Sequence, residues 1–402
     1  VLYAVGDPAT APMYPSLSGR ASLPQPSDAQ LATAADMLAT AKAPVVFAGT
    51  GVDRARANAA LIALVDLLEC PVIPSMAGRS VVPHDHPLYF NSQSPAADEL
   101  RRNADVLLVV GSRVGNLDVP FDKYWGDPAG CRVIHVDVDP RHVGVSRPIT
   151  LGIVADARAT LEGLAAKLRG RKVASHGRAD VGELRTSHAA WAKSMGDMVA
   201  AWSGHGIHPA QAIGTVGAVF GRDAVYCTDG GMTSLWAGLA LPSTKPNSYH
   251  GILELGMLGT GIPSAVGAKL GAPEREVVCV TGDGAAGFNV MELQTAARER
   301  LKITCVVMAE SEWTMEIPNE MTRWGKTFET GMGEVRWDKV AEGLGCHGEY
   351  VDSIEALPAA LARARGCAGP VLVCVRTSKE ANLAVPESGI ARFFEVYFGP
   401  SA

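Results

Sequence analysis

The stretch Val277-Val-Cys-Val-Thr-Gly-Asp-Gly-Ala-Ala-Gly-Phe-Asn289 decides the fold of the second half of the chain. It consists of an apolar strand that runs into a glycine-rich turn, and a helical stretch, residues 291–300, follows it. A second apolar run, residues 303–308, comes next. A strand, a glycine turn, a helix and a strand form one βαβ unit, so the sequence predicts two parallel strands here.

Two acidic residues, Asp283 and Glu310, follow these two strands. Because the carboxyl ends of parallel strands meet at one edge of a sheet, where α/β folds bind ligands, we expect both side chains at the same rim. Two oxygen donors beside a glycine turn and a helix N-terminus suit a magnesium ion that carries a diphosphate. The alternative for Asp283 is that it only caps the following helix.

Short apolar runs alternate with helical stretches twice along the chain, as in parallel α/β sheets. The first block has predicted strands at residues 44–48, 71–73, 106–110 and 133–136, with helices that include residues 28–41, 55–69 and 157–168. The second block has predicted strands at residues 225–228, 277–280, 303–308 and 371–375. We therefore predict an α/β protein with two doubly wound parallel-sheet domains.

The two domains are expected at residues 29–175 and 206–378. Residues 176–205 are expected to form a linker with a helix, and residues 379–402 a tail whose aromatic side chains pack on another subunit. Residues 1–28 are interpreted as an end strand followed by a linker rich in Pro, Ser and Gly.

Composition excludes several classes of protein. The net charge of −6 argues against a nucleic-acid partner, because binding to phosphates needs clustered Lys and Arg. No apolar run reaches about 18 residues, so no membrane span is expected. The eight cysteines form no CxxC pair, which favours buried reduced thiols in a cytoplasmic enzyme. A nicotinamide-dependent dehydrogenase is a poor reading, since no GxGxxG fingerprint follows a strand with an acidic residue about 20 positions on.

Four motifs in a fixed order resemble those of thiamine-diphosphate enzymes, in the group of acetolactate synthase, benzoylformate decarboxylase and benzaldehyde lyase. In the second block these are residues 228–236, Gly256-Met-Leu-Gly-Thr-Gly261 with its continuation to Lys269, and 282–301. The first block resembles the central domain of the same family in Gly49-Thr-Gly51, Pro83-His-Asp-His-Pro87, Gly111-Ser-Arg113 and residues 134–140. The resemblance covers roughly residues 1–378. It implies a Rossmann-like central domain and a thiamine-diphosphate-binding fold.

The resemblance implies a metal site made by Asp283, by Glu310 and by the backbone carbonyl of Glu312. The family places a pair of asparagines where Ala309 and Glu310 stand here, so this chain departs from the pattern. A carboxylate in place of an amide would cancel more of the metal's charge, which predicts weaker cofactor retention or a different ion preference. The alternative is that Glu310 turns outward and water replaces it.

The diphosphate is expected near three glycine-rich segments. The side chains of Thr233 and Ser234 and backbone N–H groups would donate to phosphate oxygens; for the two hydroxyls, simple helix capping is the alternative. The cofactor-binding residues that the resemblance implies here are Gly231, Met232, Thr233, Ser234, Gly282, Asp283, Gly284, Ala285, Ala286, Glu310 and Glu312.

Leu258 and Gly256 are the residues of this chain to which the resemblance assigns catalysis. Leu258 would stand between the two cofactor rings and hold them in a V, which makes proton removal intramolecular, and the carbonyl of Gly256 would accept a hydrogen bond from the aminopyrimidine. An ordinary core leucine is the alternative. Trp313, Met315 and Glu316 are candidate substrate residues, although a core role suits Trp313 and Met315 nearly as well.

The family also carries a pyrimidine-binding domain with an activating glutamate, and residues 1–5 resemble the last strand of such a domain. The rest of such a domain would then belong to a partner chain, to a precursor that was cleaved or to a chain that was trimmed. We favour a partner chain in a homo- or hetero-oligomer. In the central domain relatives bind FAD, ADP, CoA or nothing, so FAD is one option here. His84 and His86 are assigned no chemistry.

The expected function is a thiamine-diphosphate-dependent step that makes or breaks a C–C bond next to a carbonyl. Its substrate would be a 2-keto acid or a 2-hydroxyketone, and its class an acetolactate synthase-like transferase (carboligase) or lyase. One alternative is a non-catalytic scaffold or regulatory subunit with the same fold, which the Ala309-Glu310 replacement favours. Others are a 2-keto acid decarboxylase and a cyclic diketone hydrolase.

Overall fold

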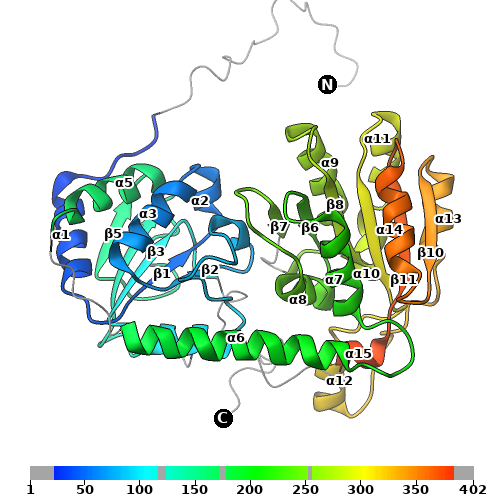
Figure 1. The fold of residues 1–402 in the computed structure, drawn as a ribbon, viewed down its shortest axis with the longest axis horizontal. Coiled ribbons are helices and arrows are strands. Elements are labelled where there is room, and N and C mark those ends of the chain that lie inside the picture. Colours follow the sequence, from blue (N-terminus) through cyan, green and yellow to red (C-terminus); the bar gives the residue numbers. More distant parts are fainter. Residues whose placement is uncertain (1–21, 116–123, 172–177, 252–255, 384–402) are drawn as a thin grey trace, which may run out of the picture.

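Two α/β domains lie side by side in the computed structural model, which describes residues 22–115, 124–171, 178–251 and 256–383 (Figure 1). A long helix, α6 (Arg178–Ala200), runs beneath both domains and contacts α4 in the first and α7 in the second. Each domain contains one sheet, and all strand pairs in both sheets are parallel. The predicted fold class is confirmed.

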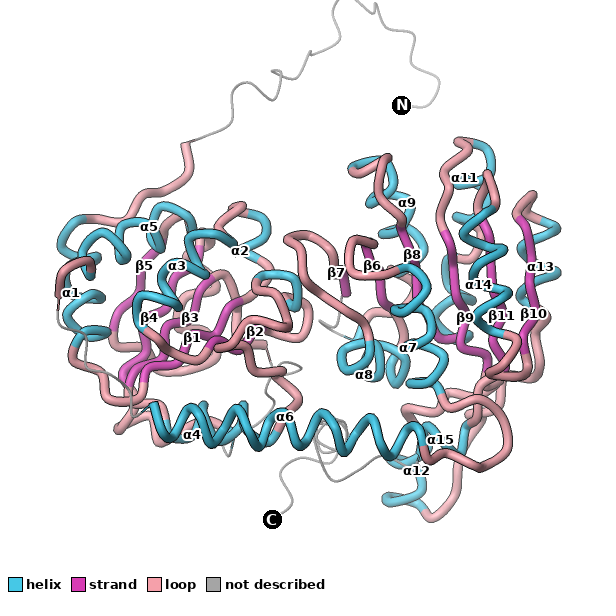
Figure 2. The backbone as a smooth tube through the Cα atoms, viewed as in Figure 1, coloured by secondary structure: helices cyan, strands magenta, loops and turns pink. Residues whose placement is uncertain are grey.

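The first domain has a five-stranded sheet in the order β2-β1-β3-β4-β5 (Figure 2). Its strands are β1 (Pro44–Ala48), β2 (Val72–Pro74), β3 (Val106–Val110), β4 (Arg132–Asp137) and β5 (Leu151–Val154). Its helices are α1 (Asp28–Ala39), α2 (Gly51–Arg54), α3 (Asn58–Leu68), α4 (Pro95–Asn103) and α5 (Ala157–Leu168), with a 3₁₀ turn, η3 (Arg79–Val81). One face of the sheet packs on α1, α3 and α5, and the other packs on α4 and α6.

The second domain has a six-stranded sheet in the order β10-β11-β9-β8-β6-β7. Its strands are β6 (Val225–Thr228), β7 (Tyr249–Gly251), β8 (Val277–Gly282), β9 (Thr304–Ala309), β10 (His347–Val351) and β11 (Val371–Arg376). Its helices are α7 (Pro209–Phe220), α8 (Gly231–Ala240), α9 (Gly261–Gly271), α10 (Asp283–Asn289), α11 (Glu292–Arg298), α12 (Ile317–Trp324), α13 (Trp337–Gly343), α14 (Leu357–Gly366) and α15 (Lys379–Leu383).

The order of the strands explains where a ligand can bind. From β6 the chain goes to β7 on one side, whereas from β8 it goes to β9 on the other. The helices that follow β6 and β8 therefore lie on opposite faces of the sheet, with α8 in one buried cluster and α10 in the other. A crevice opens at the carboxyl ends of two strands where the order reverses in this way.

Apolar strands buried on both faces form the centre of each sheet. Every residue of β1, β3 and β9 is buried, as expected of strands covered by helices on both sides. The register places Cys227, Cys279 and Cys305 next to one another on β6, β8 and β9, within one buried cluster. All eight cysteines are free, and six are buried.

Some elements differ from the prediction. The strands β5, β7 and β10 were not expected, because they are short or carry polar residues at sheet edges. The helix expected at 55–69 begins only at Asn58, since Arg56 adopts a left-handed backbone conformation between it and the short helix α2. The start of the expected tail, α15, packs within this chain, with Ala381 and Asn382 buried. The expectations for residues 1–21 and 384–402 lie outside the described residues.

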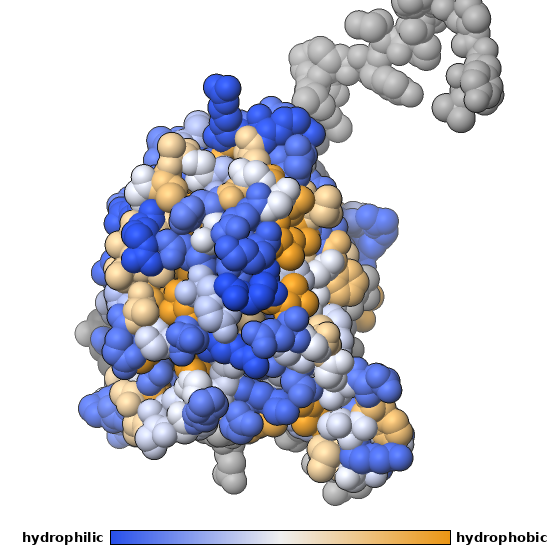
Figure 3. Space-filling view, turned by 90° about the vertical axis from the view of Figure 1, so that its right-hand side faces the viewer, coloured by the Kyte–Doolittle hydropathy of each residue, from blue (hydrophilic) through white to orange (hydrophobic). Residues whose placement is uncertain are grey.

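The surface of the second domain that faces away from the first is mostly hydrophilic, with apolar residues in small groups (Figure 3). In the described ranges, no helix is both long and apolar enough to span a membrane.

Candidate functional site

A cavity of about 150 Å³ lies at the carboxyl edge of the second sheet, between the ends of β6 and β8. It is lined by all but two of the residues predicted for the site: Gly231, Met232, Thr233, Gly256, Leu258, Gly282, Asp283, Gly284, Ala285, Glu310, Glu312, Trp313, Met315 and Glu316. The two that do not line it, Ser234 and Ala286, are buried one residue further into α8 and α10. The structure therefore brings together segments up to about 80 positions apart at the switch point of the sheet.

Asp283 lies buried at the start of α10 and joins the ends of two strands. Its carboxylate accepts hydrogen bonds from the backbone N–H groups of Gly284 at 2.8 Å, Glu310 at 2.9 Å and Ser311 at 2.6 Å. Burial raises the pKa of Asp283, and these three N–H groups partly offset that effect. The residue is not the side-chain cap of α10, whose N-cap position is Gly282.

Glu310 faces donors in the loop after β9, directly after β11 and on α15. Its carboxylate accepts hydrogen bonds from the hydroxyls of Thr314 and Thr377 and from the amide of Asn382. Burial raises the pKa of Glu310 to about 7, and the nearby carboxylate of Asp283 also raises it. Glu310 thus does not turn outward to solvent, and it lines the same cavity as Asp283.

Asp283 and Glu310 are the two side chains predicted to bind the metal, whereas Glu312 was predicted to bind it through its backbone carbonyl. The carboxylate of Glu312 forms an ion pair with Lys379 at 2.9 Å. Within the described part of the chain, no group of three His, Cys, Asp or Glu side chains is placed to hold a metal ion. A divalent cation at this edge would find two carboxylates, Asp283 and Glu310, and would need backbone or ligand oxygens for the rest of its shell.

Two glycines of the site lie directly under large side chains. A Cβ atom at Gly284 would stand 2.4 Å from the Trp313 ring, and one at Gly231 would stand 2.9 Å from Cβ of Met315. Trp313 and Met315 therefore cover the starts of α10 and α8, where the diphosphate is expected. Both are half-buried in the cavity wall, and Met315 also packs against the buried cluster of the second sheet.

The segment that carries Leu258 is held by Asp229, which sequence reasoning did not single out. The buried Asp229 carboxylate accepts hydrogen bonds from the N–H groups of Gly230 and Gly261, both at 2.7 Å. Leu258 is half-buried in the cavity wall, and the neighbouring Met257 is 51% exposed. The sequence did carry a signal for Asp229, because it directly follows an apolar strand. It follows β6 just as Asp283 follows β8.

Asn382 is the second site residue that the sequence did not reveal. It comes from α15, lines the cavity, and accepts a hydrogen bond at 2.5 Å from the indole N–H of the buried Trp236. No local motif marks it, because its role depends on the C-terminal segment returning to the sheet edge.

A second cavity, of about 330 Å³, lies beside the first and shares Asp283, Gly284 and Trp313 with it. Its remaining wall is mostly apolar and consists of Gly287, Phe288, Met332, Gly333, Val335 and Trp337. The Phe288 and Trp313 rings meet edge to face with their centroids 6.4 Å apart. The Trp313 side chain therefore separates a glycine-rich cavity from an aromatic one.

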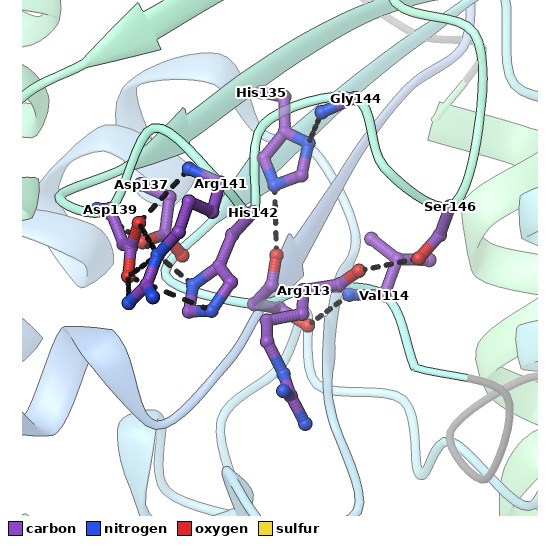
Figure 4. A network of polar contacts seen from close by, with 10 residues as sticks. Arg113, Val114, His135, Asp137, Asp139, Arg141, His142, Gly144 and Ser146 are labelled. Atoms are coloured by element: carbon purple, nitrogen blue, oxygen red, sulfur yellow. Dashed lines mark hydrogen bonds and ion pairs between the residues drawn. The ribbon is translucent and has the colours of Figure 1, made fainter.

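The glycines at the carboxyl edge of the first sheet are explained by the packing of two loops. A Cβ atom at Gly49 would stand 2.2 Å from the carbonyl oxygen of Gly111. Nearby, His135 contacts the carbonyl of Ser112 and the N–H of Gly144 (Figure 4). These contacts account for the motif without a flavin, so the structure adds nothing in favour of FAD.

Polar side chains beyond this loop pair mainly with one another. Asp139 forms an ion pair with Arg141, and Asp137 contacts His142 (Figure 4). His84 contacts Ser243 of the second domain, and His86 contacts Asp66.

Comparison with known families gives two adjacent matches. Residues 31–164 match the model of the thiamine pyrophosphate enzyme central domain. Residues 229–375 match the model of the C-terminal thiamine pyrophosphate binding domain of the same enzymes. The two matches correspond to the two sheets.

Curated relatives include enzymes of two kinds. A sulfoacetaldehyde acetyltransferase of Castellaniella defragrans is 30% identical over 385 residues, covering 87% of this chain and 63% of that protein. A sulfoacetaldehyde acetyltransferase of Rhodobacter capsulatus is 32% identical over 375 residues, with 85% and 62% covered. An acetolactate synthase large subunit of Mycobacterium tuberculosis is 32% identical over 356 residues, with 88% and 63% covered. The chain spans about three fifths of the length of these relatives.

Proposed function

The chain belongs to the thiamine pyrophosphate enzyme family, and from this premise we propose that it takes part in making or breaking a C–C bond next to a carbonyl. The proposed substrate is a 2-keto acid or a 2-hydroxyketone, and the proposed class is an acyl-transferring carboligase, with a lyase second. The observation that carries the proposal is the cavity at the sheet's switch point, which is lined by Leu258, Asp283 and the glycine-rich starts of α8 and α10.

The cofactor in this proposal is thiamine diphosphate with Mg²⁺. Thiamine diphosphate, when bound, supplies an electron sink for the carbanion of the reaction. Asp283 and Glu310 would hold the metal through their carboxylates, and Glu312 through its backbone carbonyl. The N–H groups at the start of α8 and the hydroxyl of Thr233 would bind the diphosphate.

The remaining cavity residues would shape the site and keep water out of it. Leu258 would hold the two cofactor rings at an angle, and Asp229 would fix the segment that carries it. Trp313 and Met315 would exclude water from the reacting atoms, which strengthens electrostatic interactions inside the site.

A second chain would complete the site in this proposal. Gly256 and Met257 lie exposed beside Leu258, at the rim where the pyrimidine half of the cofactor would emerge. A partner subunit, identical or different, would cover this rim and supply the activating glutamate. Sedimentation of the purified protein with and without cofactor tests this part, and a monomer with full turnover contradicts it.

The experiment that tests the function begins with cofactor binding. Unfolding should be followed with thiamine diphosphate and Mg²⁺, because a ligand at 100 times its Kd adds about 2.7 kcal/mol of stability. The Asp283→Asn variant should lose this stabilisation. Asp85→Asn, at an exposed ion pair with Arg222, is the matched control and should keep it.

Turnover then separates the alternatives. The products formed from pyruvate distinguish the two reactions, since simple decarboxylation gives CO2 and acetaldehyde, whereas carboligation gives CO2 and an adduct with an added aldehyde or a second pyruvate; cyclic diketones test hydrolysis. A non-catalytic scaffold is the second candidate, because Glu310 stands in place of an asparagine and is already engaged by three donors. Tight binding of the cofactor without turnover of any of these substrates would favour it.

A further inference from the structure

Helix α8 lies between the cavity and the first domain, and its two ends face different partners. Its first residues, Gly231 to Thr233, line the cavity, whereas its last turn meets the loop after β2 of the first domain. We propose that Arg79, with Asn91 and Gln93, positions the cofactor site by holding the far end of this helix. This inference rests on the proposed function, since it names α8 as the part that binds the diphosphate.

Three side chains of the first domain donate to backbone carbonyls of α8 and of Leu241, the residue that follows its end. Arg79 donates through Nη2 to the carbonyl of Leu241 at 3.1 Å. Asn91 donates to Gly238 at 3.2 Å, and Gln93 donates to Leu235 at 3.4 Å; both contacts come from side-chain amides. Gly238 is among the last four residues of α8, whose carbonyls have no partner within the helix, so Asn91 satisfies one of these groups.

Arg79 is unusual because its charge is buried without an acidic partner. The residue is 5% exposed, and among the described residues no carboxylate forms an ion pair with it. Its guanidinium lies 5.4 Å from the centre of the Tyr249 ring. The C-terminus of α8 supplies the compensating partial negative charge, because helix dipoles favour cations at that end.

The side chain of Gln93 lies directly against α8 at Gly238. A Cβ atom at Gly238 would stand 2.6 Å from Nε2 of Gln93. The backbone of the first domain is tied to the same region, since the hydroxyl of Ser243 donates to the carbonyl of Arg79 at 3.0 Å. The position of α8 is therefore defined by the first domain as well as by its own sheet.

A helix transmits a displacement of one end to the other. With ten residues at about 1.5 Å per residue, α8 is about 15 Å long, and its residues 232–238 are buried. Loss of the Arg79 contacts would let the last turn shift, and the N–H groups at the first turn would shift with it. Donors that are out of place bind an anion less tightly, so the first domain would contribute to cofactor affinity without touching the cofactor.

The test compares two arginines that bridge the same pair of domains. Arg79→Met removes the buried contact, whereas Arg222→Met removes the exposed ion pair between Arg222 and Asp85 and leaves α8 untouched. Two quantities should be measured on the whole protein: the Kd for thiamine diphosphate with Mg²⁺, and hydrogen–deuterium exchange at residues 231–235 without cofactor. We expect Arg79→Met to raise the Kd about tenfold and to speed exchange, with neither change in the control.

The outcomes are distinguishable. Unchanged Kd and unchanged exchange in Arg79→Met overturn the positioning role, even if the melting temperature falls. If Arg79→Met does not fold, Arg79→Lys is the deciding variant. Lysine keeps the positive charge but lacks the planar guanidinium group and its several N–H donors. A Kd and an exchange rate equal to those of the wild type then overturn the proposal. Wild-type protein that does not bind thiamine diphosphate contradicts the proposed function instead, and the exchange measurement alone then decides the positioning role.

Discussion

Asn382 donates a hydrogen bond from its side-chain amide to the carboxylate of Glu310, 72 positions earlier in the chain. The amide oxygen of Asn382 accepts the indole N–H of Trp236 at 2.5 Å. One side chain on α15 thus satisfies two buried groups that lie on different segments of the second domain. The C-terminal part of the chain is therefore joined directly to the carboxylate at the proposed metal site.

Replacing Asn382 should destabilise the protein. In Asn382→Leu, the Trp236 N–H loses its partner and one Glu310 oxygen keeps only the longer contact with Thr377, and a buried polar group left unsatisfied costs about 1–3 kcal/mol. We expect the free energy of unfolding to fall by about 2 kcal/mol or more in urea titrations. Asn103→Leu, at an exposed helix position, is the control; equal effects of the two substitutions would contradict the prediction.

A methyl group at Gly284 should be poorly tolerated. Its Cβ would stand 2.4 Å from the Trp313 ring, so Gly284→Ala must displace that ring at a cost of about 1–3 kcal/mol. Thermal unfolding and tryptophan fluorescence should both change. The same substitution at Gly287, also on α10, meets only Trp337 at 3.7 Å and should be neutral or stabilising.

The cause of this effect can be isolated with a double-mutant cycle. In a Trp313→Ala background the ring is absent, so Gly284→Ala should cost much less than in the wild type. An equal cost in both backgrounds would show that Trp313 is not the clashing group.

His208 should make stability fall in acid. The residue caps α7 by accepting the N–H of Ala210, and it lies between Trp202 and Trp236. Burial lowers the pKa of His208 to about 4. Because the unfolded chain binds a proton below about pH 6.5 and the folded chain does not, the stability held at neutral pH is lost as pH falls from about 6.5 to 4.

His208→Asn tests this contribution, since asparagine is also a good N-cap. Between pH 7 and pH 4.5, the unfolding free energy of the wild type should fall by about 2 kcal/mol more than that of the variant. A difference that stays constant with pH would mean that His208 titrates alike in both states.

Asp229 should control cofactor affinity through the Leu258 segment. In Asp229→Asn, one of the two N–H groups of Gly230 and Gly261 would face an amide N–H instead of an oxygen. We expect the Kd for thiamine diphosphate to rise about tenfold, a change of about 1.4 kcal/mol. Asp223→Asn, at the exposed ion pair with Lys245, should leave the Kd unchanged, and equal effects of the two variants would argue against this role.

Much of the fold could be predicted because apolar runs mark strands that are covered on both faces. The runs that became β1, β3 and β6 were found at their observed bounds. Edge strands such as β7 and β10 were not predicted, since an edge strand needs no continuous apolar run. Their pairing depends on neighbouring strands that are distant in sequence.

The site was predictable where residues belong to one local motif. Asp283 and Gly284 follow a strand directly, and the topology then brings them to the carboxyl edge with Glu310. Arg79 and Asn382 could not be found in this way, because each acts across a contact between distant segments. Their roles depend on how the two domains and the last helix pack together.

Cys227, Cys279 and Cys305 lie side by side in the second sheet, so their alkylation can report when that sheet opens. Burial raises the pKa of Cys227 to about 12, so almost no thiolate is present at neutral pH, and only the thiolate reacts with alkylating reagents. These three central strands must separate from their covering helices before a reagent can reach the sulfur atoms. Alkylation of these three thiols, measured separately from that of the half-buried Cys131 and Cys367, therefore reports how often the second sheet opens.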